Sequence, residues 1–301
     1  MERTSPFPQE ESRIRWISAD WLEEHLDDPE MTIIDVQPNV HDYITEHIPG
    51  AVYLSEGVLR VAARGMPTTF GPLMALQDIF RRLGLTPDRP AVVYTGRGAF
   101  KGWGDGLEQT MMAYALAKFG HDTVLVLDGG LDAWKEERRR VAQAFPTIEP
   151  SDFTVDVRGE YPIGYEEFKK TKDHDEVLLL DARPPAFYEG QGPWRKSGHI
   201  PGAINLPWRG LMADDNPARL KPDDAINAIL EHHGIGPERT VYCSCGTGRE
   251  ATNEFLLFKF YLQYPNVRIY EGSFTEWTMH PENPTVTGSE PRAREAAAPA
   301  R

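Results

Sequence analysis

Cysteine is scarce in this chain: its 301 residues include two, Cys243 and Cys245. Two cysteines separated by one residue cannot form the disulfide framework that stabilises small secreted domains. No apolar run approaches the roughly 18 residues that span a bilayer. The first residues, MERTSPFPQEES, lack the hydrophobic core of a signal peptide. We therefore expect a cytoplasmic protein that keeps its thiols free and has no membrane partner.

Positive charge is also in short supply. The 46 acidic residues outnumber the 32 lysines and arginines, which gives a formal net charge of −14. A negative field of this size disfavours nucleic acid as a partner. An anionic substrate would have to be held by local basic groups and backbone N–H groups. The remaining composition, 40% hydrophobic and 26% charged, is ordinary for a globular protein, and the length predicts two domains.

Both cysteines lie in one stretch, VYCSCGTGREA, which runs from Val241 to Ala251. The apolar start predicts a strand, and the following ATNEFLLFKFYL has the apolar spacing of a helix. A glycine-rich loop between a strand and a helix can turn its backbone N–H groups inward to form an anion nest. The helix N-terminus adds positive potential. Because both effects lower the pKa of a thiol, we predict Cys245, at the start of this loop, as the nucleophile.

The chain repeats itself at a period of about 150 residues. The string HIPGA occurs at His47 and at His199, and each copy ends on a tryptophan, Trp134 and Trp277. Strands alternating with helices in each copy predict an α/β fold of two domains, each with a mainly parallel sheet flanked by helices. The expected division is a first domain at 1–147, a second at 148–288 and a disordered tail at 289–301.

The repeat supplies an internal alignment. RPAVVYTGRGAF in the first copy overlays RTVYCSCGTGRE in the second, which pairs Thr95 with Cys245 and Val93 with Cys243. The loop glycines recur in both copies, whereas the nucleophile does not. We therefore predict that the first domain is inactive, and that Cys243 belongs to the strand core.

The second copy contains a longer segment between the strand-end residue Asp181 and His199. This insertion includes Trp194, Arg195 and Lys196. Basic residues in an added loop of the active copy are candidate ligands for the substrate. A solvated surface loop explains them equally well.

Taken together, these motifs resemble the tandem-domain rhodanese family, the thiosulfate and 3-mercaptopyruvate sulfurtransferases, over roughly residues 15–288. The resemblance is carried by DAR followed by GHIPGAINLPW, by the Cys-x-x-Gly-x-x-Ala loop at Cys245, and by EGSFTEW. It implies two rhodanese-like domains and a sulfurtransferase that needs no metal or organic cofactor. Cys245 would take sulfane sulfur from thiosulfate or 3-mercaptopyruvate as a persulfide, and a thiol or cyanide would accept it.

The residues expected to bind this small anionic donor belong to the loop and to the insertion. They are Gly246, Thr247, Gly248, Arg249, Glu250, Arg195 and Lys196. The opening Cys-Gly-x-Gly resembles the mercaptopyruvate branch of the family. Two positions depart from the family pattern: Phe187 replaces a frequent arginine, and Glu250 replaces a hydroxyl. Arg249, Arg195 or Lys196 would then compensate for the missing cation, while Arg183 is expected to brace the strand end.

Two alternatives remain at this point. Cys243 and Arg249 form a Cys-x5-Arg pattern that resembles the phosphate loop of cysteine phosphatases and arsenate reductases, with Arg249 binding phosphate. Tyr242 stands where those enzymes usually have histidine. The other alternative is a non-catalytic sulfur carrier or redox module, in which Cys243 and Cys245 could form a strained disulfide.

Overall fold

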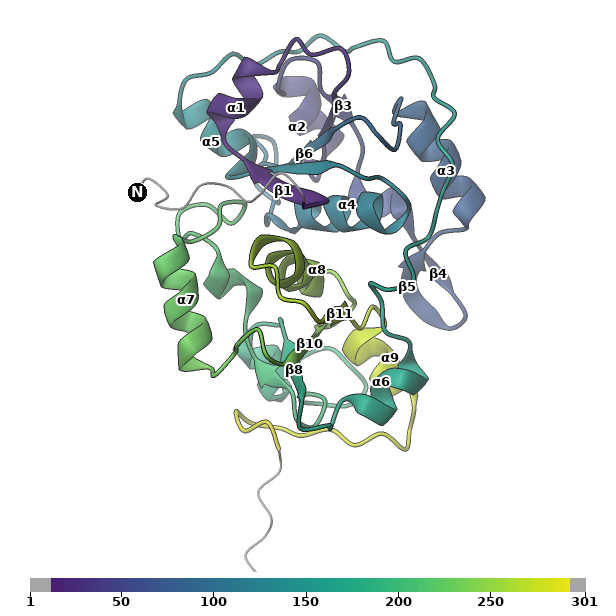
Figure 1. Cartoon of the computed structure of the whole chain (residues 1–301), viewed down its shortest axis with the longest axis vertical. Coiled ribbons are helices and arrows are strands. Elements are labelled where there is room, and N and C mark those ends of the chain that lie inside the picture. Colours follow the sequence, from purple (N-terminus) through teal and green to yellow (C-terminus); the bar gives the residue numbers. More distant parts are fainter. Residues whose placement is uncertain (1–11, 293–301) are drawn as a thin grey trace, which may run out of the picture.

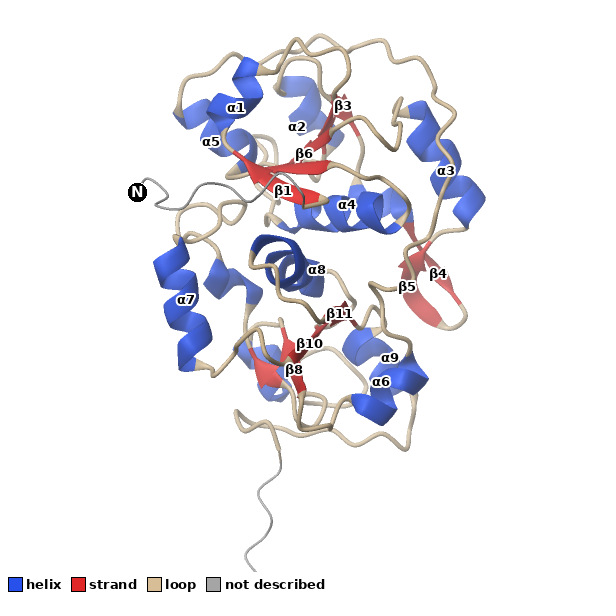
Figure 2. Ribbon diagram, viewed as in Figure 1, coloured by secondary structure: helices blue, strands red, loops and turns tan. Residues whose placement is uncertain are grey.

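The computed structural model describes residues 12–292, which form two α/β lobes placed end to end (Figure 1). Residues 1–11 lie outside the described residues, as does the 293–301 part of the predicted tail. Strands occupy the middle of each lobe and helices surround them (Figure 2). Within residues 12–292, no helix is both long and apolar enough to cross a membrane.

The first domain is built on a five-stranded sheet in which every neighbouring pair is parallel. The strand order is β1 (Ile14–Ile17), β7 (Val124–Leu127), β6 (Ala91–Tyr94), β2 (Thr32–Asp35) and β3 (Val52–Tyr53). Its helices are α1 (Ala19–Glu24), α2 (Val40–Thr45), α3 (Leu73–Arg82), α4 (Leu107–Lys118) and α5 (Gly130–Glu136). A 3-10 helix, η1 (Glu56–Leu59), leads into a separate antiparallel hairpin of β4 (Arg60–Ala63) and β5 (Met66–Phe70).

The second domain has a four-stranded sheet, again parallel throughout. Its order is β11 (Val267–Ile269), β10 (Thr240–Ser244), β8 (Val177–Asp181) and β9 (Ile204–Asn205). Its helices are α6 (Tyr165–Thr171), α7 (Asp223–His232), α8 (Glu250–Leu256) and α9 (Ser273–Met279). The predicted fold class is confirmed: two α/β domains, each with a parallel sheet and flanking helices.

Local sequence explains several of these elements. Ser18 caps α1 as expected, because its hydroxyl accepts a hydrogen bond from the Trp21 N–H at 3.1 Å. The four residues of β6 and of β7 are all buried, which fits their unbroken apolar sequence. The motif EGSFTEW after β11 leads into helix α9.

The repeat predicted from the sequence is visible in equivalent hydrogen bonds. His47 Nδ1 lies 2.7 Å from the carbonyl oxygen of Tyr43, and His199 Nδ1 lies 3.0 Å from that of Tyr188. Both histidines are fully buried. They therefore fix the turn after the second helical segment of each domain and are structural residues.

The tail predicted at 289–301 begins with residues that are held against the second domain. The carbonyl oxygen of Pro291 accepts a hydrogen bond from the Gly202 N–H at 2.7 Å, and Arg292 pairs with Asp173 at 2.7 Å. Residues 289–292 therefore have partners in the fold that their sequence does not reveal, and disorder of the predicted tail stays a prediction.

The two domains meet along α4 and α8, which lie between the two sheets (Figure 1). All twelve residues of α4 are buried. The Tyr114 ring of α4 packs edge-on against Phe255 of α8, with ring centroids 5.4 Å apart. The hydroxyls of Thr110 and Thr252 lie 3.3 Å apart in the same interface. Because α8 follows the cysteine loop directly, this interface also places the loop against the first domain.

Candidate active site

The two cysteines occupy different structural positions. Cys243 lies inside β10, in register with Leu180 of β8 and Ile269 of β11. Cys245 is the first residue after the carboxyl end of β10, and the loop that follows it ends where α8 begins at Glu250. Both side chains are fully buried. The prediction that Cys243 belongs to the strand core is confirmed by this register.

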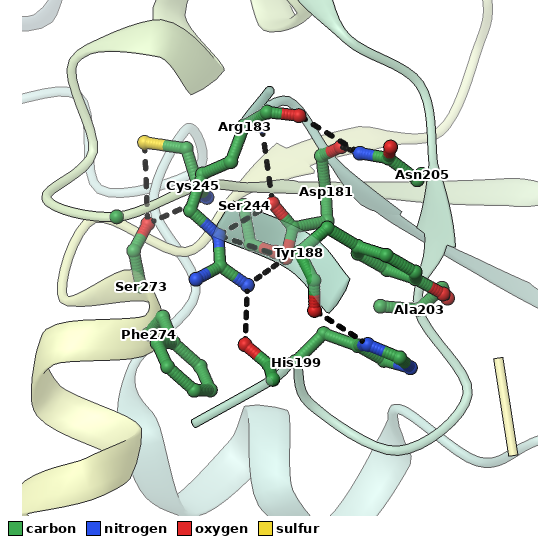
Figure 3. Close-up of polar contacts among 12 residues, drawn as sticks. Asp181, Arg183, Tyr188, His199, Ala203, Asn205, Ser244, Cys245, Ser273 and Phe274 are labelled. Atoms are coloured by element: carbon green, nitrogen blue, oxygen red, sulfur yellow. Dashed lines mark hydrogen bonds and ion pairs between the residues drawn. The ribbon is translucent and has the colours of Figure 1, made fainter. Parts of the chain in front are cut away.

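The loop forms the nest of N–H groups that its glycines suggested. The Gly248 N–H donates to Cys245 Sγ at 3.1 Å, and the backbone N–H groups of Thr247 and Ala251 also lower the pKa of this thiol. Ser273 Oγ accepts the Cys245 N–H at 3.0 Å and lies 3.9 Å from the sulfur (Figure 3). These donors converge on the position where a thiolate or persulfide would carry its charge.

Gly248 is required by this geometry. Its φ of +82° lies in the left-handed region that disfavours residues with a side chain. A Cβ at this position would lie 2.6 Å from the carbonyl oxygen of Glu271. The loop can therefore turn its N–H groups toward the sulfur only with glycine at this position.

The expected lowering of the Cys245 pKa is not what the structure gives. Burial raises the pKa of the Cys245 thiol well above its ordinary value, and the charge and hydrogen bond of the Glu250 carboxylate raise it further. The N–H groups of the nest oppose these effects. The nest and the helix N-terminus are visible in the sequence, whereas the complete burial of the sulfur and the effect of the neighbouring carboxylate are not.

Arg249 points into the domain interface. Its Nη1 and Nη2 atoms contact Asp105 Oδ2 and Oδ1 at 2.6 and 3.0 Å, and its Nε pairs with Glu56. Glu108 Oε1 lies 3.4 Å from Nη2. The charge of Arg249 is thus matched by three carboxylates of the first domain. Its role as a ligand for the donor anion stays a prediction, which this arrangement does not favour.

The two basic residues of the insertion also lie apart from the nest. Arg195 is exposed. Lys196 donates through Nζ to the carbonyl oxygens of His280 at 3.1 Å and Pro281 at 2.7 Å, and also to that of Asn283. Lys196 therefore ties the insertion to the segment after α9, and no contact of either residue with the loop supports the predicted ligand role.

The insertion reaches the loop through Trp194 instead. A Cβ on Gly246 would lie 2.4 Å from the Trp194 ring, so the indole rests directly on this part of the loop. Trp194 Nε1 donates to Thr275 Oγ1 at 2.8 Å, and that hydroxyl donates to the Gly246 carbonyl oxygen at 2.7 Å. Phe187 packs edge-on against Trp194, with centroids 5.9 Å apart. The insertion thus covers the loop with an aromatic wall.

Arg183 braces the end of β8, as expected. Its Nε and Nη2 atoms contact the Asp181 carboxylate at 2.9 and 2.6 Å, and Nη2 also donates to the Gly198 carbonyl oxygen at 3.0 Å (Figure 3). Both side chains are buried, and the guanidinium carbon lies 4.2 Å from the ring centroid of Phe274. The positive charge of Arg183 is therefore matched within the fold.

The equivalent loop of the first domain is filled by its own side chains. The Leu131 N–H donates to the Thr95 carbonyl oxygen at 2.8 Å, just as the Phe274 N–H donates to that of Cys245 at 3.0 Å. Thr95 thus occupies the position of Cys245, as the internal alignment indicated. Its hydroxyl donates to Glu108 Oε2 at 3.1 Å, which leaves the loop with no thiol and with a carboxylate beside it. The inactivity of this domain stays a prediction.

Arg60, at the start of the β4–β5 hairpin, lies next to the loop although the sequence gives no sign of it. Arg60 Nη2 donates to the carbonyl oxygen of Thr247, 187 positions away in the sequence. A pocket of about 290 Å³ opens beside this contact between the two domains, and it is lined by the hairpin, by α4 and by Thr247 and Gly248 of the loop. Neither periodicity nor a motif marks Arg60, because its importance depends on how the domains dock.

Comparisons with known proteins agree with this architecture. The profile of the rhodanese-like domain family matches residues 18–137 and 165–280. The chain is 28% identical over 285 residues to the 3-mercaptopyruvate sulfurtransferase of Escherichia coli K12, covering 89% of this chain and 96% of that enzyme. It is 29% identical over 264 residues to the thiosulfate sulfurtransferase of Azotobacter vinelandii, covering 87% of this chain and 93% of that enzyme.

A solved structure shows the same likeness in three dimensions. The crystal structure of SseA from Escherichia coli, a 3-mercaptopyruvate sulfotransferase, superimposes with a TM-score of 0.76 at 28% identity, covering 86% of this chain and 98% of that one. The family profile matches both halves of the chain, and the two sheets repeat the same parallel design. The chain therefore belongs to the rhodanese family, as a tandem pair of rhodanese-like domains related to the sulfurtransferases.

Proposed function

We propose that this protein moves sulfane sulfur from a small anionic donor to a thiol or cyanide acceptor through a persulfide on Cys245. The observation that carries the proposal is the nest around Cys245 Sγ, in which the Gly248 N–H already donates to the sulfur at 3.1 Å. Preorganised N–H dipoles in a site without water stabilise charge that develops during a reaction. A thiolate and a persulfide both place their negative charge there.

The reaction has two steps. The Cys245 thiolate attacks the outer sulfur of the donor and forms a sulfur–sulfur bond. Thiosulfate loses sulfite by breaking its own sulfur–sulfur bond, whereas 3-mercaptopyruvate loses pyruvate by breaking its carbon–sulfur bond, and the carbanion then takes up a proton. In the second step, an acceptor thiolate or cyanide attacks the outer sulfur of the persulfide, and Cys245 leaves again as a thiolate.

The charges near the sulfur favour 3-mercaptopyruvate over thiosulfate as the donor. The Glu250 carboxylate acts on Cys245 through its charge and through a hydrogen bond. Thiosulfate is a dianion and 3-mercaptopyruvate is a monoanion, so thiosulfate brings more negative charge toward this carboxylate. Arg249 and Arg183 lie nearby but are each held by carboxylates of the fold.

The phosphatase alternative finds less support in the geometry. It requires Cys243 as the nucleophile, but Cys243 lies within β10, and the neighbouring strands β8 and β11 pair with it on both sides. It also requires Arg249 to bind phosphate oxygens, and that guanidinium already contacts Asp105, Glu56 and Glu108.

Mass spectrometry and steady-state kinetics with both donors test the proposal on three proteins: wild type, Cys243→Ala and Cys245→Ser. We expect one added sulfur on Cys245, turnover in the first two proteins, and no turnover in Cys245→Ser. Phosphatase activity that is lost in Cys243→Ala and kept in Cys245→Ser, with no turnover of either sulfur donor, would favour the phosphatase alternative. A persulfide on Cys245 that neither cyanide nor a small thiol removes would favour the sulfur carrier.

A further inference from the structure

The pocket between the domains differs in character from the nest that holds the sulfur. Its walls include the apolar or aromatic side chains of Met66, Phe70 and Tyr114, and its volume is about 290 Å³. One water needs ~10–15 Å³ on the same measure. An inorganic ion would leave most of this space empty, whereas an organic molecule with an apolar body would fill it.

Arg60 supplies the positive charge of the pocket. Among the lining residues that the structure describes, Arg60 is the one lysine or arginine. Within residues 12–292 its guanidinium has one hydrogen-bond partner, the Thr247 carbonyl oxygen at Nη2, which leaves its other N–H groups available to a ligand. Burial lowers the pKa of Arg60, and the charges of Cys245, Glu56 and Glu271 oppose that shift. The pocket therefore offers one guanidinium beside Thr247, in the loop that surrounds the thiol.

The wall between this pocket and the thiol is thin. Thr247 and Gly248 line the pocket, and the Gly248 N–H donates to Cys245 Sγ at 3.1 Å. A ligand seated against these two residues lies one backbone layer from the sulfur. One short segment of the first domain contacts the cysteine loop at two points. Glu56 pairs with Arg249, and Arg60 binds Thr247.

Negative groups elsewhere in the pocket limit the charge of the ligand. Glu271 and Glu276 also line it. Glu271 is paired with Lys118 and accepts a hydrogen bond from the Tyr114 hydroxyl at 2.6 Å, so Lys118 is not free to bind an anion. With one guanidinium and two carboxylates, the pocket suits a molecule with a single anionic group placed next to Arg60.

We propose that Arg60 of the first domain holds the carboxylate of the organic sulfur donor in this pocket, and that it is therefore a specificity-determining residue. The proposal deepens the sulfurtransferase function and rests on it for the identity of the reaction. It assigns the first domain a direct part in substrate selection, although that domain has no nucleophile of its own.

Alkylation of Cys245 tests the pocket without any sulfur transfer. Iodoacetate carries a carboxylate and iodoacetamide is its neutral counterpart, so the ratio of their rates measures attraction of the carboxylate while the reactivity of the thiol cancels. All proteins carry Cys243→Ala, so that Cys245 alone reacts. Arg60→Gln removes the charge, Arg60→Lys retains it, and Arg64→Gln removes an exposed arginine from the turn of the same hairpin.

We expect Arg60→Gln to lower the iodoacetate-to-iodoacetamide ratio roughly tenfold, as loss of a charged hydrogen bond implies. Arg60→Lys should keep most of the ratio, and Arg64→Gln should leave it unchanged. Pyruvate should protect Cys245 from iodoacetamide in the Cys243→Ala parent but not in Arg60→Gln. The proposal is overturned if Arg60→Gln leaves the ratio unchanged, or if it slows both reagents equally, since Arg60 would then only support the loop.

The two proposals can fail separately. If the ratio depends on Arg60 but neither sulfur donor reacts, the carboxylate site stands and the sulfurtransferase function falls. If 3-mercaptopyruvate turns over with the same KM in Arg60→Gln and in wild type, the carboxylate site falls and the sulfurtransferase function stands.

Discussion

The guanidinium of Arg249, four residues beyond Cys245, makes two hydrogen bonds to the carboxylate of Asp105 in the other domain, at 2.6 and 3.0 Å. Glu56 and Glu108 complete the set of carboxylates around it. This ionic cluster thus holds the cysteine loop against the first domain. The side chain of Arg249 is 23% exposed, so solvent screens part of this interaction.

Replacing Arg249 by Gln should lower the free energy of unfolding, because three carboxylates would lose their shared cation. We expect a loss of about 1–3 kcal/mol, less than the value for a fully buried pair. Urea denaturation at neutral pH measures it. Arg82→Gln is the matched control, because Arg82 pairs with Asp78 on an exposed face of α3 and should change stability by less than about 1 kcal/mol. Equal effects of the two substitutions would argue against a stabilising role for the cluster.

Replacing Glu250 by Gln should lower the pKa of the Cys245 thiol. After burial, the Glu250 carboxylate is the main cause that raises this pKa, through its charge and then its hydrogen bond. The rate of alkylation by iodoacetamide follows the thiolate fraction, so its pH profile should move to lower pH in Glu250→Gln. Glu24→Gln, at an exposed position of α1, serves as the control. An unchanged profile would show that the carboxylate does not act on the sulfur in solution.

Glu254 offers a test of stability against pH. Both of its carboxylate oxygens are buried and lack a hydrogen-bond partner among the described residues, and burial raises its pKa well above the ordinary 4.5, with the charges of Asp181 and Glu250 adding to the shift. The folded protein therefore keeps a proton that the unfolded chain releases above about pH 4.5. Stability is consequently lost as the pH rises from there toward the folded-state pKa.

Glu254→Leu should remove this penalty. We expect a gain of about 1–3 kcal/mol at pH 7, the cost of an unsatisfied buried polar group. The gain should shrink as the pH falls below 4.5, where the wild-type side chain becomes protonated in both states. Urea denaturation of both proteins across this range measures the difference. A difference that does not vary with pH would mean that packing, and not the proton, determines the effect.

Trp194 should restrict access to the sulfur from the side of the insertion. Its ring rests on Gly246, and its Nε1 is held by Thr275 at 2.8 Å. In Trp194→Ala the wall over the loop opens, so alkylation of Cys245 by iodoacetamide should become faster while the thermal midpoint falls. Trp103→Ala removes an indole that is 64% exposed on the first domain and should change neither quantity. A rate that stays the same in Trp194→Ala would place the path to the sulfur elsewhere, for example on the side of Thr247 and Gly248.

The sequence by itself determined the fold class and the repeat, and it singled out Cys245 as the predicted nucleophile. Each of these depends on neighbours along the chain: the apolar run of β10, the glycines after Cys245 and the paired histidines at 47 and 199 are local signals. Even the bracing of Asp181 by Arg183 links residues two positions apart. Local steric and hydrophobic preferences are sufficient to produce such features.

The tertiary structure alone decided which side chains meet the loop. Arg60 reaches Thr247 across 187 positions, and Arg249 reaches Asp105 across 144. The net charge of the chain could not show that Arg249 is already paired with carboxylates, or that Glu250 and complete burial together raise the pKa of Cys245. Contacts and burial of this kind arise from the docking of α4 on α8. That docking depends on the complementary shape of two surfaces that lie far apart in the sequence.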